Sequence, residues 1–166
     1  MRPIINLCNV LIRATMPVMN TENQYTKRIK DFSHGDWIEL QSLYRRVASH
    51  DGSFYAFEDC DSSTECVMQL PYILEADIVR DVRQYLYSRN LVVLFDWSHW
   101  EAGREFFRSD AVDKFDSISA IAVLKLLTAV IRNDRFNDGA FAHLFETGDA
   151  ARLLARLLDF MPAATD

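Results

Sequence analysis

Glycine and cysteine are scarce in this 166-residue chain. Its five glycines are not closely spaced, which excludes the Walker A loop and the dinucleotide-binding fingerprint, because both need several glycines in one short turn. Three cysteines are an odd number for a disulfide framework, and a chain of this length buries enough apolar surface to fold without cross-links. We therefore expect one domain in a reducing, cytoplasmic setting, with Cys60 and Cys66 unpaired.

Long apolar runs are also missing from the sequence. No segment approaches the ~20 consecutive apolar residues of a membrane-spanning helix. The apolar run at residues 4–12 is interrupted by two asparagines and is not followed by a small-residue cleavage site, unlike a secretion signal. We expect no membrane contact, and we predict an N-terminal extension outside the domain, one mostly helical domain and a short tail, at residues 1–24, 25–162 and 163–166 respectively.

Positive charge is in deficit, since 18 lysines and arginines face 24 aspartates and glutamates and give a net charge of −6. Binding to nucleic acid depends on a basic patch that neutralises several phosphates, so we expect no direct contact with nucleic acid. The deficit is strongest over residues 51–65, which contain no lysine or arginine. The carboxylates of this stretch are Asp51, Glu58, Asp59, Asp61 and Glu65.

Apolar residues recur at helical spacing over most of the chain and predict a mainly α fold. Helices are predicted at residues 25–32, at 37–49 with Asp36 as the N-cap, from Pro71 through Leu86 and at 118–132. Two more are predicted, one capped by Asn137-Asp138 and ended by Gly148, and one capped by Asp149 and running through Met161. The segment 118–132 is apolar on nearly all sides and is therefore predicted to be the central helix. Residues 91–95 fit either a buried strand or a continuation into the next turn.

Two short segments have the composition of strands. Residues 53–57 and 64–70 are rich in aromatic or β-branched residues and are separated by a polar loop, which predicts a hairpin. Together the patterns predict a compact single-domain helical bundle with a small β-hairpin at one edge.

Several short motifs occur in a fixed order along the chain: Pro71-Tyr72, then Phe95-Asp96-Trp97-x-x-Trp100, then Ile131-Arg132-x-Asp134-Arg135-Phe136-x-x-Gly139. This succession resembles a family of small bacterial proteins that is catalogued only as a domain of unknown function. The resemblance covers roughly residues 37–158 and is strongest over 132–139, while the N-terminal extension departs from the family pattern. It implies a bacterial or phage protein with one cytosolic domain, and it implies no activity.

The acidic stretch is the first candidate for function. Acidic runs are more often solvated loops, but aromatic residues beside unbalanced charge are typical of protein interfaces. We therefore predict a non-enzymatic binding module, a bacterial or phage-encoded inhibitor or regulator that acts on a basic protein surface. The predicted contact residues are Phe54, Tyr55, Phe57, Glu58, Asp59, Asp61 and Glu65. The oligomeric state is left open.

The alternative is a small hydrolase-like enzyme. Its site would combine Asp96, His99, Arg132, Asp134 and Arg135. A structural explanation competes with this one, because arginines after a buried helix suit its free carbonyls. In that explanation Asp134 pairs with an arginine and Phe136 plugs the core, so that Phe136→Ala costs ~3–5 kcal/mol if the ring is buried.

Motifs for metal and nucleophilic chemistry are weak. Asp96 and His99 approach each other if their segment is helical, and Glu101 or Glu105 lies nearby in sequence, but no second metal-binding set follows, so we expect no metal or other cofactor. There is no Gly-x-Ser-x-Gly elbow, and the neighbours Ser98 and His99 do not face each other on a helix or a strand. A Cys-His pair remains open, with Cys60 or Cys66 beside His34 or His50. We expect no catalytic residue.

Overall fold

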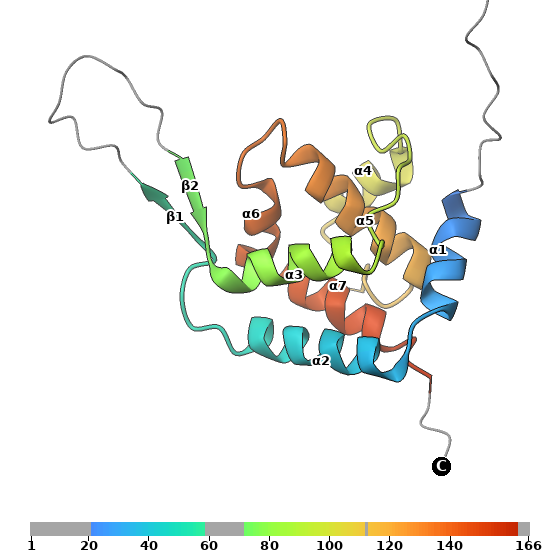
Figure 1. Cartoon of the computed structure of the whole chain (residues 1–166). Coiled ribbons are helices and arrows are strands. Elements are labelled where there is room, and N and C mark those ends of the chain that lie inside the picture. The colour runs from blue at the N-terminus through green and yellow to red at the C-terminus, as the bar shows by residue number, and fades with distance from the viewer. Residues whose placement is uncertain (1–20, 59–71, 112, 163–166) are drawn as a thin grey trace, which may run out of the picture.

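The computed structural model describes residues 21–58, 72–111 and 113–162. Within these ranges the chain forms seven helices and one two-stranded antiparallel sheet (Figure 1). The elements are α1 (Thr21–Lys30), α2 (His34–Ala48), β1 (Tyr55–Glu58), β2 (Tyr72–Glu75), α3 (Asp77–Ser88), α4 (Glu101–Arg108), α5 (Ala120–Asn133), α6 (Ala140–Glu146) and α7 (Asp149–Leu158). The predicted mainly α fold with a small hairpin is confirmed.

Helix α5 is the centre of the bundle, as its apolar sequence predicts. It contacts α1, α4, α6 and α7, and its buried face includes Val123, Leu127 and Ile131. Its one buried polar residue, Thr128, shares a hydrogen bond of 2.8 Å with the hydroxyl of Tyr25 on α1. Satisfying both hydroxyls in this way allows α1 to pack against an otherwise apolar helix.

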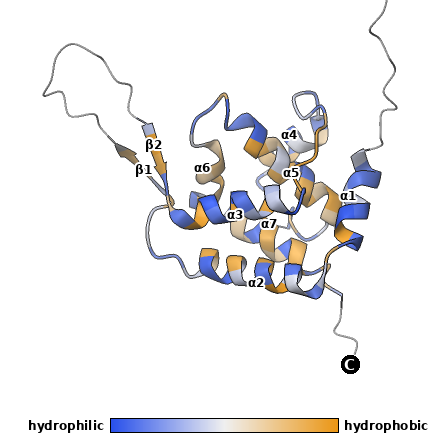
Figure 2. Cartoon of the chain, viewed as in Figure 1, coloured by the Kyte–Doolittle hydropathy of each residue, from blue (hydrophilic) through white to orange (hydrophobic). Residues whose placement is uncertain are grey.

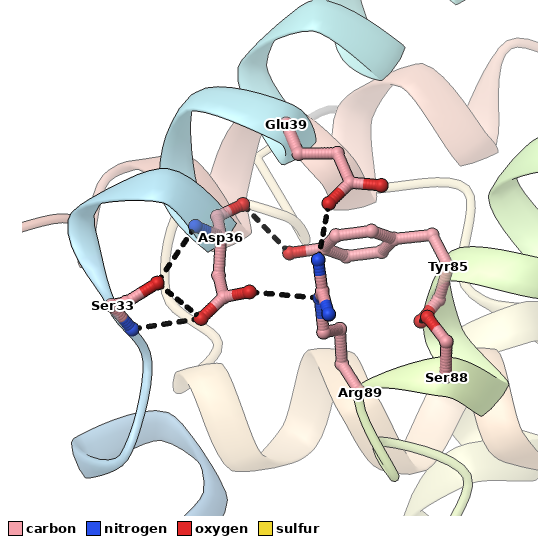
Figure 3. Close-up of polar contacts among 6 residues, drawn as sticks. All are labelled: Ser33, Asp36, Glu39, Tyr85, Ser88 and Arg89. Carbon is pink, nitrogen blue, oxygen red and sulfur yellow. Dashed lines mark hydrogen bonds and ion pairs between the residues drawn. The ribbon is translucent and has the colours of Figure 1, made fainter.

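The start of α2 differs from the predicted cap. Ser33, not Asp36, is the N-cap residue, and Asp36 completes a capping box by accepting hydrogen bonds from the Ser33 backbone N–H at 2.8 Å and from the Ser33 hydroxyl at 2.7 Å. Figure 3 shows how this box joins α3: the hydroxyl of Tyr85 donates to the Asp36 carbonyl, and Arg89 forms ion pairs with Asp36 and Glu39. These contacts fix α2 beside α3.

The second strand of the hairpin lies where the sequence analysis predicted a helix. Strand β2 pairs with β1 so that Tyr55 faces Glu75 and Phe57 faces Ile73, and α3 begins only at Asp77. The burial of β2 alternates, as a strand with one face on the protein requires. The predicted strand at 64–70 lies outside the described residues. Figure 2 shows that both strands are hydrophobic although the hairpin projects from the helical bundle.

Residues 91–95 form neither a strand nor a helix. Leu91 and Val93 are buried while Leu94 is exposed, so this connection is fixed by two inward side chains and by the hydrogen bond from Thr128 to the Leu91 carbonyl. No helix in the described ranges is long and apolar enough to span a bilayer. Cys60 and Cys66 lie outside these ranges.

Candidate functional site

A cavity of about 550 Å³ lies between the hairpin and the helices that surround the C-terminal end of α5. We call it the hairpin groove. Its walls come from both strands, from α4, α5 and α6, and from the start of α7. The lining residues are Tyr55, Phe57, Ile73, Phe107, Val130, Asn133, Asn137, Asp138, Gly139, Ala140, His143, Leu144, Thr147 and Asp149. This volume is in the range of small-molecule and peptide sites, ~300–1,000 Å³.

A partly buried network of ion pairs connects the hairpin to the start of α6. The guanidinium of Arg83 on α3 donates to Asp134 at 2.7 Å and also pairs with Glu75 at the end of β2. The other oxygen of Asp134 accepts the backbone N–H of Phe141 at 2.9 Å, and Arg83 stacks over the Phe141 ring. One arginine therefore joins β2, α3, the end of α5 and the start of α6.

Direct packing also sets the width of the groove. Gly139, the N-cap of α6, has φ +82°, and a Cβ built there would lie 2.3 Å from Cδ1 of Ile73 on β2. Only glycine accepts both this backbone conformation and this close approach. The Asn137-Asp138 pair that was predicted to cap α6 instead lines the groove.

The groove is negatively charged. Asp138 and Asp149 line it without any lysine or arginine, and neither forms an ion pair with another described residue. Burial raises the pKa of Glu75, at the end of β2, against the lowering effect of Arg83, and repulsion by the carboxylates of Asp134 and Asp138 raises it further. A cation that entered the groove would relieve this repulsion.

A smaller apolar pocket of about 220 Å³ adjoins the groove and shares Phe107, Val130 and Asn133 with it. We call it the tryptophan pocket. Its other lining residues are Trp97, Ser98, Trp100, Gly103, Arg104 and Ala129. At its rim Phe136 lies 6.4 Å from the ring of Trp97 and is 82% exposed. The prediction that Phe136 plugs the core is therefore wrong: the ring turns away from α5 towards Trp97.

The predicted contact residues on the hairpin separate into two groups. Tyr55 and Phe57 line the groove, and 65% of Phe57 is exposed. Phe54 packs inward between His50 and Phe145, and its backbone N–H donates to Glu146 at 2.9 Å. Phe54 therefore anchors the hairpin to α6 rather than offering a surface. Among the acidic residues, Glu58 ends β1, and Asp59, Asp61 and Glu65 lie outside the described residues.

Asp96 and His99 do meet, in a turn rather than in a helix. Nδ1 of His99 lies 3.0 Å from a carboxylate oxygen of Asp96 and 3.1 Å from the hydroxyl of Ser98. Ser98 and His99 can meet because their segment is a turn and not the helix or strand on which such neighbours would point apart. Hydrogen bonds from His99 and Ser98 lower the pKa of Asp96. A catalytic triad needs the serine and the acid on opposite ring nitrogens, whereas here both use Nδ1. This arrangement is a turn motif on an exposed loop.

The remaining residues of the alternative site are not gathered around that turn. Asp134 pairs with Arg83 rather than with Arg132 or Arg135, and Arg135 is exposed. Among hydrogen bonds and ion pairs between described residues, none joins the Asp96 turn to Arg132 in the last turn of α5 or to Arg135 after it. Trp97 instead has its ring beside that of Phe136. The described ranges contain no group of acidic, histidine and cysteine side chains that would hold a metal.

Comparison with known proteins gives one result. Residues 32–163 match a family of unknown function, DUF6508. The chain belongs to the DUF6508 family. No curated protein and no solved structure matches it significantly. The sequence resemblance to a domain of unknown function is thus confirmed, and the DUF6508 region contains every residue of both cavities while α1 lies outside it.

The sequence patterns did not single out three residues that shape the candidate site of this DUF6508 protein. Asp138 was assigned to a helix cap, and Asp149 was assigned to the next one. Arg83 was placed on the polar side of α3, where nothing in the local pattern distinguishes it from its charged neighbours. Arg83 and Asp134 are 51 residues apart in the sequence, and only folding brings their side chains into contact.

Proposed function

We propose that this DUF6508 protein is a non-enzymatic binding module that takes a basic segment of a partner protein in the hairpin groove. The observation that supports this is the lining of the groove: the aromatic side chains of Tyr55 and Phe57 and the carboxylates of Asp138 and Asp149 line the same cavity, and its described lining contains no lysine or arginine. Exposed aromatic residues supply most of the affinity at protein interfaces, and unbalanced charge selects the partner.

The acidic stretch after β1 extends the same negative surface in sequence. Glu58, Asp59, Asp61 and Glu65 follow directly on Phe57, the most exposed lining aromatic on the hairpin. In this proposal they steer a basic surface towards the groove before the aromatic contacts form. The module acts in the cytoplasm as an inhibitor or regulator, encoded by a bacterium or a phage, and works by occupying its partner's basic surface.

Affinity capture from the source organism tests the proposal. The wild-type protein and two variants, Phe57→Ser and the double variant Asp138→Asn/Asp149→Asn, are immobilised at equal density. Asp31→Asn/Asp116→Asn is the matched control, because both carboxylates are exposed and line neither cavity. We expect a protein with a basic surface that wild type and control retain and both groove variants lose. Retention of the same proteins by all four samples contradicts the proposal.

A further inference from the structure

The tryptophan pocket has the size of one side chain. An apolar cavity of about 150 Å³ is large enough to hold benzene, and sites for drug-sized ligands start near 300 Å³. At about 220 Å³ this pocket takes one aromatic ring or one large aliphatic side chain. It opens beside the hairpin groove, because Phe107, Val130 and Asn133 line both.

One wall of the pocket is fixed and the other is accessible. The indole of Trp100 rests on the backbone of α4, where a Cβ on Gly103 would lie 2.3 Å from Cε3 of Trp100. Lys125, on α5, has its ammonium group 5.0 Å from the centroid of the same Trp100 ring. Trp97 is half-buried and contacts the exposed Phe136. A pocket lined by one fixed indole and by accessible aromatic side chains, here Trp97 and Phe107, resembles the interface pockets that form around an anchor side chain.

Charge is divided between the two ends of the combined cavity. The one charged residue that lines the tryptophan pocket, Arg104, already donates to the Ser98 carbonyl and lies 3.8 Å from Glu101. The unpaired carboxylates, Asp138 and Asp149, belong to the hairpin groove. A ligand that satisfies both ends therefore carries an apolar group at one end and a cation at the other.

From this division we infer that the partner segment is bipartite: an aromatic or large aliphatic side chain enters the tryptophan pocket, and a lysine or arginine close to it in sequence reaches Asp138 and Asp149. This inference rests on the proposed function and adds to it the chemistry of the recognised segment. The apolar side chain slows dissociation of the bound segment, and the cation fixes the orientation of the segment along the groove.

Short synthetic peptides are the probe. Each has a serine-glycine background of ten residues and blocked ends. One series carries Phe and Arg separated by two, three or four residues, and the comparison peptides carry Phe alone, Arg alone, or Phe with Glu. Trp97 and Trp100 report binding by fluorescence, since the peptides contain no tryptophan and Trp37, the third in the chain, is buried in the core. We expect the best Phe-Arg peptide to bind at least about tenfold more tightly than any comparison peptide, or ~1.4 kcal/mol.

Variants separate the two ends. Ala129→Leu fills the tryptophan pocket from α5, and Ser98→Leu fills it from the exposed rim without touching the core. Each is expected to reduce the affinity of the Phe-Arg peptide to that of the Arg peptide and to leave the Arg peptide unchanged. Ala102→Leu, exposed on α4 and outside both cavities, is the control. Asp138→Asn/Asp149→Asn is expected to abolish the preference for Arg over Glu.

Two results overturn the inference. Either no Phe-Arg peptide binds more tightly than the Phe-Glu peptide, or both pocket-filling variants bind the Phe-Arg peptide as wild type does. Neither result touches the capture experiment, in which loss of the partner from the Phe57→Ser column still supports the proposed function. Conversely, failure of that capture with a clear Phe-Arg preference leaves a bipartite peptide site and removes its assignment to a basic protein partner.

Discussion

Two carboxyl groups that join neighbouring elements have pKa values displaced in opposite directions. The hydrogen bonds from the side chain and backbone of Ser33 hold the pKa of Asp36 below its ordinary 3.8. Burial at the end of β2 raises the pKa of Glu75 above its ordinary 4.5, against the opposing effect of Arg83. Folding therefore favours the charged form of Asp36 and the neutral form of Glu75.

The two groups are expected to give stability opposite dependences on pH. The contribution of Asp36 is present above its unfolded pKa and is lost as the pH falls through the lower folded value. The contribution of Glu75 is present below its unfolded pKa and is lost as the pH rises through the higher folded value. Relative to wild type, Asp36→Asn should therefore become more stable as the pH falls below about 4, and Glu75→Gln should become more stable as the pH rises above about 4.5.

Urea unfolding of the three proteins at closely spaced pH values measures this. The free energy of unfolding of each variant minus that of wild type is plotted against pH, so that a constant offset from the lost contacts drops out. Parallel profiles for the two variants would contradict the opposite displacements.

Arg83 contacts Asp134 through the fold, and Arg135 follows Asp134 in the sequence. We expect Arg83 to contribute far more to stability than Arg135. Arg83→Ala leaves Asp134 and Glu75 without a cation in a setting where their side chains are only 10% and 16% exposed. The cost should approach the ~3–5 kcal/mol of a broken buried pair, so we expect about 2–4 kcal/mol. Arg135→Ala, on an exposed side chain, should change stability by less than ~0.5 kcal/mol.

Chemical denaturation of both variants decides between these roles. Equal midpoints for Arg83→Ala and wild type would mean that the network does not hold the hairpin. A large loss in Arg135→Ala would restore the earlier pairing of Asp134 with its sequence neighbours.

At the scale of elements, helices with long amphipathic patterns are predictable from sequence and the hairpin is not. Three of the four leucines of α7 and most apolar residues of α5 are buried, as their spacing predicts. Residues 72–75 were assigned to α3 because Leu74 continues the helical stripe of Ile78 and Val82. In the structure this segment pairs with β1 as strand β2, and Leu74 is 43% exposed. A four-residue strand has too few residues for its period to compete with an adjoining helix pattern.

Caps were misplaced for a related reason. Ser33 and Asp36 form one reciprocal box, and from sequence either fits the N-cap position. Gly139 and Gly148 are both N-caps with positive φ, whereas the polar residues beside them were predicted to cap. The cap positions were predicted from side-chain hydrogen-bond acceptors alone, whereas the caps of α6 and α7 depend on the backbone conformation of glycine.

These two glycines allow a matched experiment on how β2 and α6 meet. Both have nearly the same backbone, φ +82° at Gly139 and +78° at Gly148. A Cβ at Gly148 meets nothing within 4 Å, whereas at Gly139 it collides with Ile73. Gly148→Ala should therefore cost only the backbone strain, about 1–2 kcal/mol. Gly139→Ala should cost measurably more, because the side chain of Ile73 on β2 must also move.

Thermal or urea unfolding compares the two variants directly. Gly139→Ala should in addition weaken binding in the hairpin groove, because Ile73 lines it, while Gly148→Ala should not. Equal costs and equal binding would show that the Ile73 side chain rearranges without cost and does not set the contact between β2 and α6.

For the whole molecule, the candidate site depends on contacts that the sequence does not reveal. The hairpin aromatics Tyr55 and Phe57 were identified from composition, but the surface opposite them comes from residues 137–149. The Asp96 motif, in contrast, drew attention because its residues are close in sequence, and the structure explains it as a turn. Local patterns identify which residues are unusual, and only the packing of α3, α5 and α6 decides which of them share a surface.

The net charge of −6 gives the final prediction, which concerns the rate of association. Carboxylates that steer a basic partner act over the Debye length, about 8–10 Å at ordinary salt concentrations, so their effect on the association rate must weaken as salt is added. Replacing Glu58, Asp59 and Asp61 by Ser removes three charges next to Phe57 in the sequence and changes none of the described residues that line the groove. We expect slower association with the captured partner, a flatter dependence on salt, an almost unchanged dissociation rate and an unchanged unfolding midpoint.

Stopped-flow or biosensor kinetics at several salt concentrations measures both rates. Phe57→Ser is the matched comparison, since it should raise the dissociation rate and leave the salt dependence of association intact. If the triple variant associates at the wild-type rate with the wild-type salt response, the acidic stretch plays no part in recognition. The steering charge must then come from Asp138 and Asp149 inside the groove, where their double variant would show the flattened response instead.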